Sequence, residues 1–552
     1  MISSLKEKIR KTGARLRQRN DRAQTPCIHR NPTRRTKNTH CCGAVEIFHC
    51  ARLDREVHHT KCCTCDEYST RRVRSKTGDA VFVCHREGEK ETARDGGTCS
   101  KHWTPGSPST GFRVLNARLV PSVPTIPTAK PDVRFFELHG QHVAFDANSL
   151  CAVHLDESLA RPLRNSGADT FRGLLFSRQK PQFRLSRAAP VRRVVLSVTH
   201  ACNLACTYCF AGGNQSQPSM SKIVATKGLG LLDPRSTVDI AFFGGEPLLE
   251  WDLICRTIDD AESLARKRGV KSKFHITTNG LLLDRKKVDF LSQHSCSVLV
   301  SLDGPEAIHN RYRPARDPGI NSFRAVMDAL DAAKGTPLGR RLMTRATFDA
   351  ADAHLMERLE FFAGLSDAGV IQGFSVEPAV LGEGCAQRSG GLDRNRIADE
   401  YHAAAEWFVQ RARTRRRADF FHYRKLIQRI LYAKHSGTEC GAGIGYVTVG
   451  TDGTLYACHR EAGTQVGHVD YGFDEQARAA WMDNRVYARP GCASCWARYL
   501  CGGGCRQACL ELAGDLHAPV PERCFLQQTL LKECLWILTQ LSRNEITRVV
   551  KP

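Results

Sequence analysis

The chain has 552 residues, with 80 Lys and Arg against 57 Asp and Glu, so its formal net charge is +23. Its length exceeds that of one ordinary domain, and an apolar fraction of 41% suffices for packed cores. No apolar run reaches membrane-spanning length, and the basic N-terminus lacks the apolar centre of a signal peptide, which predicts a cytoplasmic protein with no membrane partner. The positive excess suits a nucleic-acid partner but is also typical of a solvated basic surface, which we favour.

Twenty-five cysteines point to metal or cluster ligation, because a cytosolic chain rarely keeps disulfides. Residues 1–103 hold nine of them, interspersed with histidines, which suggests a zinc-ribbon-like segment whose metal would be Zn; an unstructured tail is the alternative. These nine are Cys27, Cys41, Cys42, Cys50, Cys62, Cys63, Cys65, Cys84 and Cys99.

A linker rich in Pro, Ser and Thr is expected at residues 104–131, before a compact segment at residues 132–190. The alternating runs RFFEL and HVAFD predict a hairpin that turns at His139 and Gly140, with a helical pattern beginning near Glu157.

Short apolar runs then alternate with helix-length segments. We predict six parallel strands at residues 194–199, 239–243, 273–278, 297–302, 342–348 and 373–378. This α/β pattern indicates a partial (β/α)6 barrel over residues 191–385, a fold whose chemistry lies at the carboxyl ends of the strands. Beyond it we expect a helical connector at 386–439, a cysteine-rich domain at 440–538 and a tail at 539–552.

Three cysteines follow the first predicted strand with the spacing Cys202-x3-Cys206-x2-Cys209. A four-iron cluster normally takes four thiolates, so three would leave one iron open for another ligand, as catalysis requires. A zinc loop is the alternative, although it would usually draw a fourth ligand from nearby.

Polar and glycine residues end the following strands. Gly244 and Gly245 permit close backbone approach, and Glu246, before Pro247, can accept a hydrogen bond from an ammonium group. Arg345 on the fifth strand could pair with a carboxylate, or form an ordinary surface ion pair. The third and fourth strands end at Asn279 and at Ser301 with Asp303.

Seven cysteines recur near the C-terminus in a regular frame. Cys440 is followed by Gly453 and Cys458, and then come Cys492-x2-Cys495-x5-Cys501-x3-Cys505 and Cys524. A zinc ribbon would also suit the CxxC pair of this frame.

The CxxxCxYC run and the strand-end motifs resemble the radical S-adenosylmethionine (SAM) superfamily. That resemblance implies a [4Fe–4S] cluster on the first three cysteines, SAM chelated to its open iron, and Tyr208 against the adenine. It assigns the GGEP run to the SAM amino group. Asn279, Ser301 and Asp303 would lie near the ribose and methionyl parts, and Arg345 near the carboxylate.

The C-terminal frame resembles the SPASM extension of peptide-modifying members, which implies two auxiliary [4Fe–4S] clusters and three clusters in all. Cys440, Cys458 and Cys505 would hold auxiliary cluster I, and Cys492, Cys495, Cys501 and Cys524 would hold auxiliary cluster II. No fourth cysteine is obvious for auxiliary cluster I. Cys509 could supply it, or Cys509 could be an ordinary buried helix residue. In the second case the open iron could bind a substrate thiolate.

Runs such as FFGGEPLLEW, SLDGPEAIHNRYR and CWARYLCGGGC look like maturases that install thioether cross-links in six-cysteine (SCIFF-type) peptides. The resemblance implies a cysteine-containing peptide or protein substrate, an electron donor such as flavodoxin or ferredoxin, and a winged-helix-like element at 132–190 that grips a leader peptide. Sulfatase-maturing relatives, which form formylglycine, carry an acidic base where this chain has His459, and this difference favours the thioether. A maturase that forms Cys-to-Asp/Glu thioethers in a larger subunit is a further alternative. The non-enzyme alternative is a zinc-binding adaptor for nucleic acid or protein.

Overall fold

The computed structural model describes residues 45–50, 55–57, 69–75, 82–84, 102–103, 112–115, 132–158, 160–161, 190–210, 218–349, 353–379, 393–483 and 485–550. The chain divides into two compact units, residues 1–182 with 429–435 and residues 183–428 with 436–552. Among the described helices, none has the length and apolar character that crossing a membrane requires.

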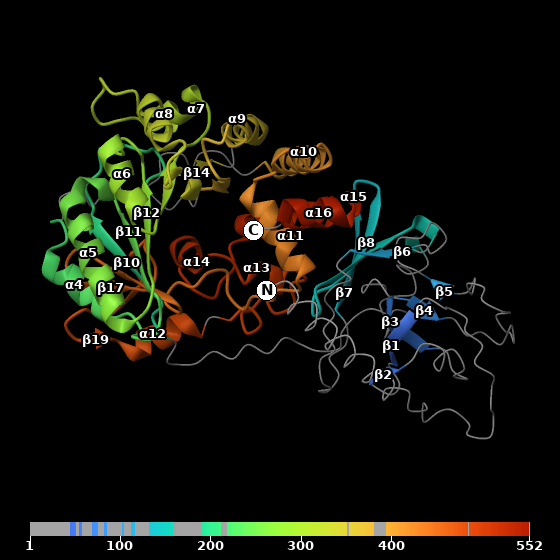
Figure 1. Ribbon diagram of the computed structural model, residues 1–552. Coiled ribbons are helices and arrows are strands. Elements are labelled where there is room, and N and C mark those ends of the chain that lie inside the picture. The colour runs from blue at the N-terminus through green and yellow to red at the C-terminus, as the bar shows by residue number, and fades with distance from the viewer. Residues whose placement is uncertain are drawn as a thin grey trace, which may run out of the picture. The chain divides into compact units, whose positions relative to one another are not determined.

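A mixed sheet forms the centre of the second unit (Figure 1). Its parallel part runs in the order β15-β14-β13-β12-β11-β10, and each strand lies within one residue of its predicted position. The strands are β10 (Arg193–Thr199), β11 (Val238–Gly244), β12 (Ser272–Thr278), β13 (Cys296–Ser301), β14 (Leu342–Phe348) and β15 (Phe374–Pro378). The linear order leaves the sheet open, as a partial barrel requires.

Crossover helices cover one face of this sheet, where α4, α5 and α6 lie side by side in Figure 1. Their ends carry the expected signals: Asp284 caps α6, Asn321 caps α8, and Gly269 ends α5 in the left-handed conformation. The helical elements are α4 (Lys222–Gly230), η2 (Pro247–Glu250), α5 (Trp251–Arg268), α6 (Arg285–Gln293), α7 (Glu306–Tyr312), α8 (Ser322–Ala333), η3 (Gly339–Arg341), α9 (Leu355–Asp367), α10 (Arg394–Arg413) and α11 (Phe421–Leu431).

The cysteine-rich region continues the same sheet, which the sequence did not lead us to expect. β16 (Tyr446–Val449) pairs in parallel with β10, with Val194 opposite Val447 and Leu196 opposite Val449. The antiparallel strands β17 (Thr454–Tyr456), β18 (Gln465–His468) and β19 (Gly472–Phe473) extend it.

Helices complete this region, namely α12 (Glu475–Met482), α13 (Arg498–Cys501), α14 (Arg506–Ala513), α15 (Pro521–Gln540) and α16 (Arg543–Val550). The segment expected as a tail therefore contains a folded helix, and Ile546 and Val550 of α16 are buried.

The described part of the first unit contains two antiparallel sheets. The hairpin of β7 (Val133–Leu138) and β8 (Gln141–Asp146) turns at His139 and Gly140 as predicted, and the strand order is β6-β9-β8-β7 with β6 (Phe112–Val114) and β9 (Cys151–Leu155). Another sheet has the order β2-β1-β3-β4-β5. Its strands are β1 (Val45–Cys50), β2 (Arg55–Val57), β3 (Ser69–Ser75), β4 (Phe82–Cys84) and β5 (His102–Trp103).

Most of the expected linker at 104–131 lies outside the described residues, as do the N-terminal cysteines apart from Cys50 and Cys84, which are described only as strand positions.

Candidate active site

The loop that carries Cys202, Cys206 and Cys209 begins where β10 ends, and the segment after α7 pairs with it. Ala205 N donates to the Pro314 carbonyl at 2.8 Å and Thr207 N to the Tyr312 carbonyl at 3.0 Å. On the far side of these bonds, Arg316 N donates to the Asn203 carbonyl at 3.0 Å. Residues 312–316 therefore form a backbone clamp that fixes the spacing of the cysteine loop.

Two of the three sulfurs accept hydrogen bonds. Cys202 Sγ accepts from Leu204 N at 3.4 Å and from Asn279 Nδ2 at 3.7 Å, and Cys206 Sγ accepts from Arg313 Nη1 at 3.9 Å. Burial raises the pKa of Cys206 to about 12, against the opposing charge of Arg313. Three thiols on one loop with N–H donors aimed at sulfur are the donor set that an iron–sulfur cluster requires.

Gly244 and Gly245 allow the end of β11 to approach the start of this loop. A Cβ on Gly244 would lie 2.2 Å from the Thr199 carbonyl oxygen, and one on Gly245 would lie 2.3 Å from that of Ala201. The close approach that the sequence suggested is thus made to the chain's own backbone. Pro247, two residues on, is buried and begins η2.

Glu246 is fully buried and binds the chain itself. Its carboxylate accepts from Leu248 N at 2.9 Å, Thr278 Oγ1 at 2.8 Å and Asn279 N at 2.7 Å. Burial raises the pKa of Glu246 to about 7 in spite of these donors. The carboxylate therefore joins the ends of β11 and β12, which was not part of the sequence interpretation.

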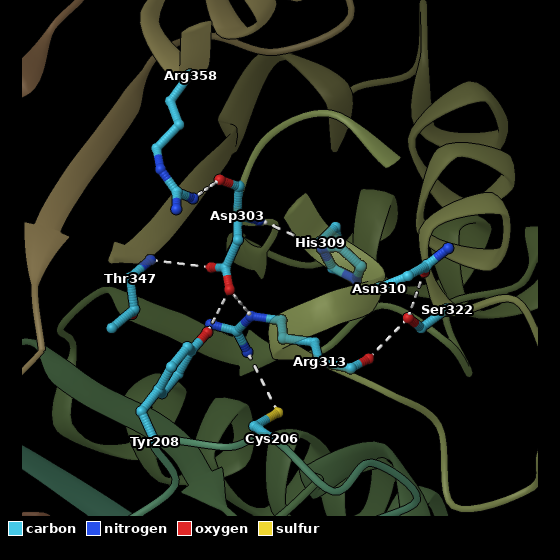
Figure 2. Close-up of polar contacts among 9 residues, drawn as sticks. All are labelled: Cys206, Tyr208, Asp303, His309, Asn310, Arg313, Ser322, Thr347 and Arg358. Atoms are coloured by element: carbon cyan, nitrogen blue, oxygen red, sulfur yellow. Dashed lines mark hydrogen bonds and ion pairs between the residues drawn. The ribbon is translucent and has the colours of Figure 1, made fainter. Parts of the chain in front are cut away.

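Asp303 is the centre of a buried network that Figure 2 shows. Its carboxylate accepts from Thr347 N at 2.9 Å and from the Tyr208 hydroxyl, and it pairs with Arg313 Nε at 3.1 Å. Arg358 donates to its main-chain carbonyl. Sequence reasoning singled out Tyr208 and Asp303 but missed both arginines, although Arg313 stands in the SLDGPEAIHNRYR run.

Arg345 and Ser301 face each other across β13 and β14 in register. Arg345 Nε donates to Ser375 Oγ at 3.2 Å and pairs with Glu377 at 3.3 Å, so this arginine already has an ion-pair partner on β15. His422 lies 3.8 Å from the same Glu377 carboxylate. Arg345, which could bind a carboxylate, and Glu377, which could bind a cation, thus lie together on β14 and β15.

The segment 458–461 meets the cysteine loop. The His459 ring lies edge-on to Phe243 of β11 with centroids 4.6 Å apart, and Arg460 lies over the Phe210 ring at 5.2 Å. His200 lies 3.5 Å from Glu461. Burial, followed by the charges of Arg345 and Arg460, lowers the pKa of His459 to about 4.

The cysteines from Cys440 to Cys524 form two sets, and within each set neighbouring thiols raise one another's pKa. Burial, and then the Cys505 and Cys440 thiols, raise the pKa of Cys458 to about 12. Burial, and then Cys492, Cys495 and Cys509, raise the pKa of Cys524 to about 11.

Cys501 belongs with the second group, since Cys524 and Cys495 act on its thiol after burial and Glu439. Cys509 also lies with this second group, and its sulfur accepts from Arg489 Nη2 at 3.2 Å.

Residues 196–343 match the Radical SAM superfamily, so the chain contains a radical SAM domain. The domain begins inside β10 and ends inside β14, and it includes the three cysteines of the loop. A [4Fe–4S] cluster and SAM are the cofactors that this family implies.

Individual relatives match over part of the chain. The radical SAM cyclopropyl synthase TigE of Paramaledivibacter caminithermalis is 22% identical over 206 residues, which are 34% of this chain and 43% of TigE. A cysteine-type anaerobic sulfatase-maturating enzyme of Clostridium perfringens is 28% identical over 160 residues, 26% of this chain and 41% of that enzyme. The chain spans about two fifths of the length of these curated relatives.

The solved structure of native anSMEcpe with bound AdoMet has a TM-score of 0.55 at 19% identity, covering 64% of this chain and 100% of that one. At this level of identity, the similarity shows a shared fold alone.

Proposed function

We propose that this protein modifies a cysteine-containing peptide or protein by radical SAM chemistry, forming a thioether cross-link. The observation that carries the proposal is the contact between segment 458–461 and the cysteine loop. Arg460 lies over Phe210, which follows Cys209, and His459 packs against Phe243 of β11, so the neighbourhood of Cys458 lies at the cysteine loop and the adjacent strand end. This contact favours a reaction that uses SAM together with an auxiliary cluster, because one substrate would have to reach both.

Cys202, Cys206 and Cys209 are the proposed ligands of the SAM cluster. The N–H donors at two of their sulfurs favour the thiolate form that ligation needs, and they oppose the burial that raises the pKa of both thiols. When bound, the cluster and SAM would supply a 5′-deoxyadenosyl radical. The family's cofactor thus fits the residues present.

The SAM molecule would be held by groups at the strand ends. Arg345 is the proposed partner of its carboxylate and would have to share or leave Glu377. Ser301, opposite Arg345, and Asn279, beside Cys202, remain proposed contacts of the ribose and methionyl parts. Glu246 is better suited to support the site than to bind the ammonium group directly, because both its oxygens accept bonds from the chain.

Two auxiliary [4Fe–4S] clusters are proposed for the SPASM region. The electrostatic grouping supports Cys440, Cys458 and Cys505 as one set, and Cys492, Cys495, Cys501 and Cys524 as the other. Cys509 lies with the second set, which argues against it as the missing ligand of the first.

His459 is the proposed catalytic base, acting next to Phe243 at the end of β11. The case for this role is the position of the ring, because the pKa of about 4 by itself makes His459 a weak proton acceptor. Formylglycine formation is the second candidate, favoured by the sulfatase-maturating relative at 28% identity.

A peptide partner suits the hairpin unit. β7 lies at the edge of the sheet β6-β9-β8-β7, where an extended leader peptide could add as a further strand. The anSMEcpe structure has also been solved with a bound Cp18Cys peptide. A flavodoxin or ferredoxin as electron donor, and zinc in residues 1–103, remain proposals.

Anaerobic reconstitution followed by mass spectrometry tests the function. Cys206→Ala should abolish SAM cleavage, whereas Cys495→Ala should keep part of it but lose product, because only the first removes a SAM-cluster ligand. With a cysteine-containing peptide encoded near this protein, a thioether appears as the loss of two hydrogens with a blocked thiol. Conversion of the cysteine to formylglycine would instead establish the second candidate, and full SAM cleavage by Cys206→Ala would overturn the cluster assignment.

A further inference from the structure

Arg313 is a buried cation that touches the cysteine loop at its middle sulfur. One edge of its guanidinium pairs with Asp303, with Nε 3.1 Å from Oδ2, while Nη1 donates to Cys206 Sγ at 3.9 Å. The same group lies over the Tyr208 ring at 5.3 Å. Figure 2 shows the guanidinium between the carboxylate and the sulfur.

The backbone leaves Arg313 little freedom. The residues on either side of it, Tyr312 and Pro314, use their carbonyls to bind the cysteine loop at Thr207 and Ala205. Its own carbonyl accepts from Ser322 Oγ at 2.7 Å. Because both neighbours are fixed to the loop, the backbone of Arg313 is held beside the loop whenever the clamp is formed.

Asp303 holds the other side of the guanidinium. Thr347 N and the Tyr208 hydroxyl bind its two oxygens, so the carboxylate cannot turn away. The positive group therefore lies between the carboxylate and Cys206, and the nearer charge at the sulfur is that of Arg313. Asp303 and Tyr208 are thereby supports of this arginine.

We propose that Arg313 is a positioning residue that donates a hydrogen bond to the Cys206 thiolate and raises the reduction potential of the SAM cluster. A positive donor at a ligand sulfur stabilises the reduced, more negative state of an iron–sulfur cluster. The inference rests on the proposed ligation of that cluster by Cys202, Cys206 and Cys209.

The test is an EPR-monitored redox titration of the reconstituted protein. The signal that changes when SAM is added belongs to the cluster with the open iron, which separates it from auxiliary clusters. Arg313→Gln should lower the midpoint potential of this signal. Arg313→Lys should lower it less, because an ammonium keeps the charge but cannot span Asp303 and Cys206 in the same way.

Arg316→Gln is the matched control. Arg316 is exposed, and its Nε donates at 3.0 Å to the main-chain carbonyl of Cys202 rather than to a sulfur, so its variant removes a positive charge beside the same loop and should leave the midpoint unchanged. If Arg313→Gln does not retain iron, Arg313→Lys decides. An Arg313→Gln midpoint equal to that of the wild type overturns the inference, as does an equal shift in Arg316→Gln. Where only Arg313→Lys retains iron, an unchanged midpoint in that variant overturns it. A wild-type protein without any SAM-responsive cluster would instead overturn the proposed function.

Discussion

At the scale of single residues, burial decides what a polar side chain can do. Glu246 looks from the sequence like a ligand for an ammonium group, but it is fully buried and satisfies donors from two neighbouring strand ends. Asp303 similarly binds Tyr208 and Arg313 within the protein. A carboxylate whose two oxygens both accept hydrogen bonds from the protein stabilises the structure of the site rather than binding a ligand directly.

Glu246→Gln should destabilise the folded protein by about 1–3 kcal/mol, because the amide NH2 that replaces Oε2 cannot accept from Asn279 N. The wild-type pKa of about 7 lies above the ordinary value of 4.5, so the unfolded chain releases its proton first as pH rises. Stability from this group is therefore present below pH 4.5 and is lost toward pH 7, by up to ~1.4 kcal/mol per pH unit.

Apparent melting temperatures at pH 5.5 and 7.5 measure both effects, with the partly exposed Glu250→Gln as the control. The idea fails if Glu246→Gln keeps the same pH dependence as the wild type.

At the scale of elements, the cysteine loop depends on two neighbours that hold its backbone. Residues 312–316 clamp it from one side, and the GGEP turn after β11 packs against its start. The sequence predicted the strand ends but could not show that these two segments, distant along the chain, meet the same loop.

Gly245→Ala should weaken this packing, because its Cβ would lie 2.3 Å from the Ala201 carbonyl oxygen and 2.5 Å from that of His200. We expect a loss of about 1–3 kcal/mol in stability together with lower iron retention. Thermal unfolding and iron content per chain are the measurements. Gly230→Ala is the control, since a Cβ there meets nothing within 4 Å; equal behaviour of the two variants would contradict the packing argument.

For the molecule as a whole, the radical SAM domain and the cysteine-rich region share one sheet. β16 covers the edge of β10 with parallel pairing from Arg193 to Leu196, so neither region is a separate sheet. This continuity accounts for the position of segment 458–461 against the cysteine loop.

Deletion of residues 440–552 should leave the β10 edge with unpaired backbone donors and acceptors, and exposed strand edges promote association. We expect the truncated protein to aggregate, as measured by size-exclusion chromatography against the undeleted chain. A soluble monomer with an intact circular dichroism spectrum would show that β16 is dispensable for the sheet.

Local sequence patterns were enough to predict the six parallel strands, the hairpin at His139 and Gly140, and the cysteine loop after β10, because periodicity and cysteine spacing are local properties. The spacing of Cys202, Cys206 and Cys209 already predicted the radical SAM domain that residues 196–343 match.

Tertiary contacts were needed to establish that Arg313 reaches Cys206, that Glu246 binds Thr278 and Asn279, and that β16 joins β10. These contacts join segments separated by 32 to 107 positions for the side chains. Burial and hydrogen bonding bring such partners together on folding. Residue spacing along the chain does not predict these contacts.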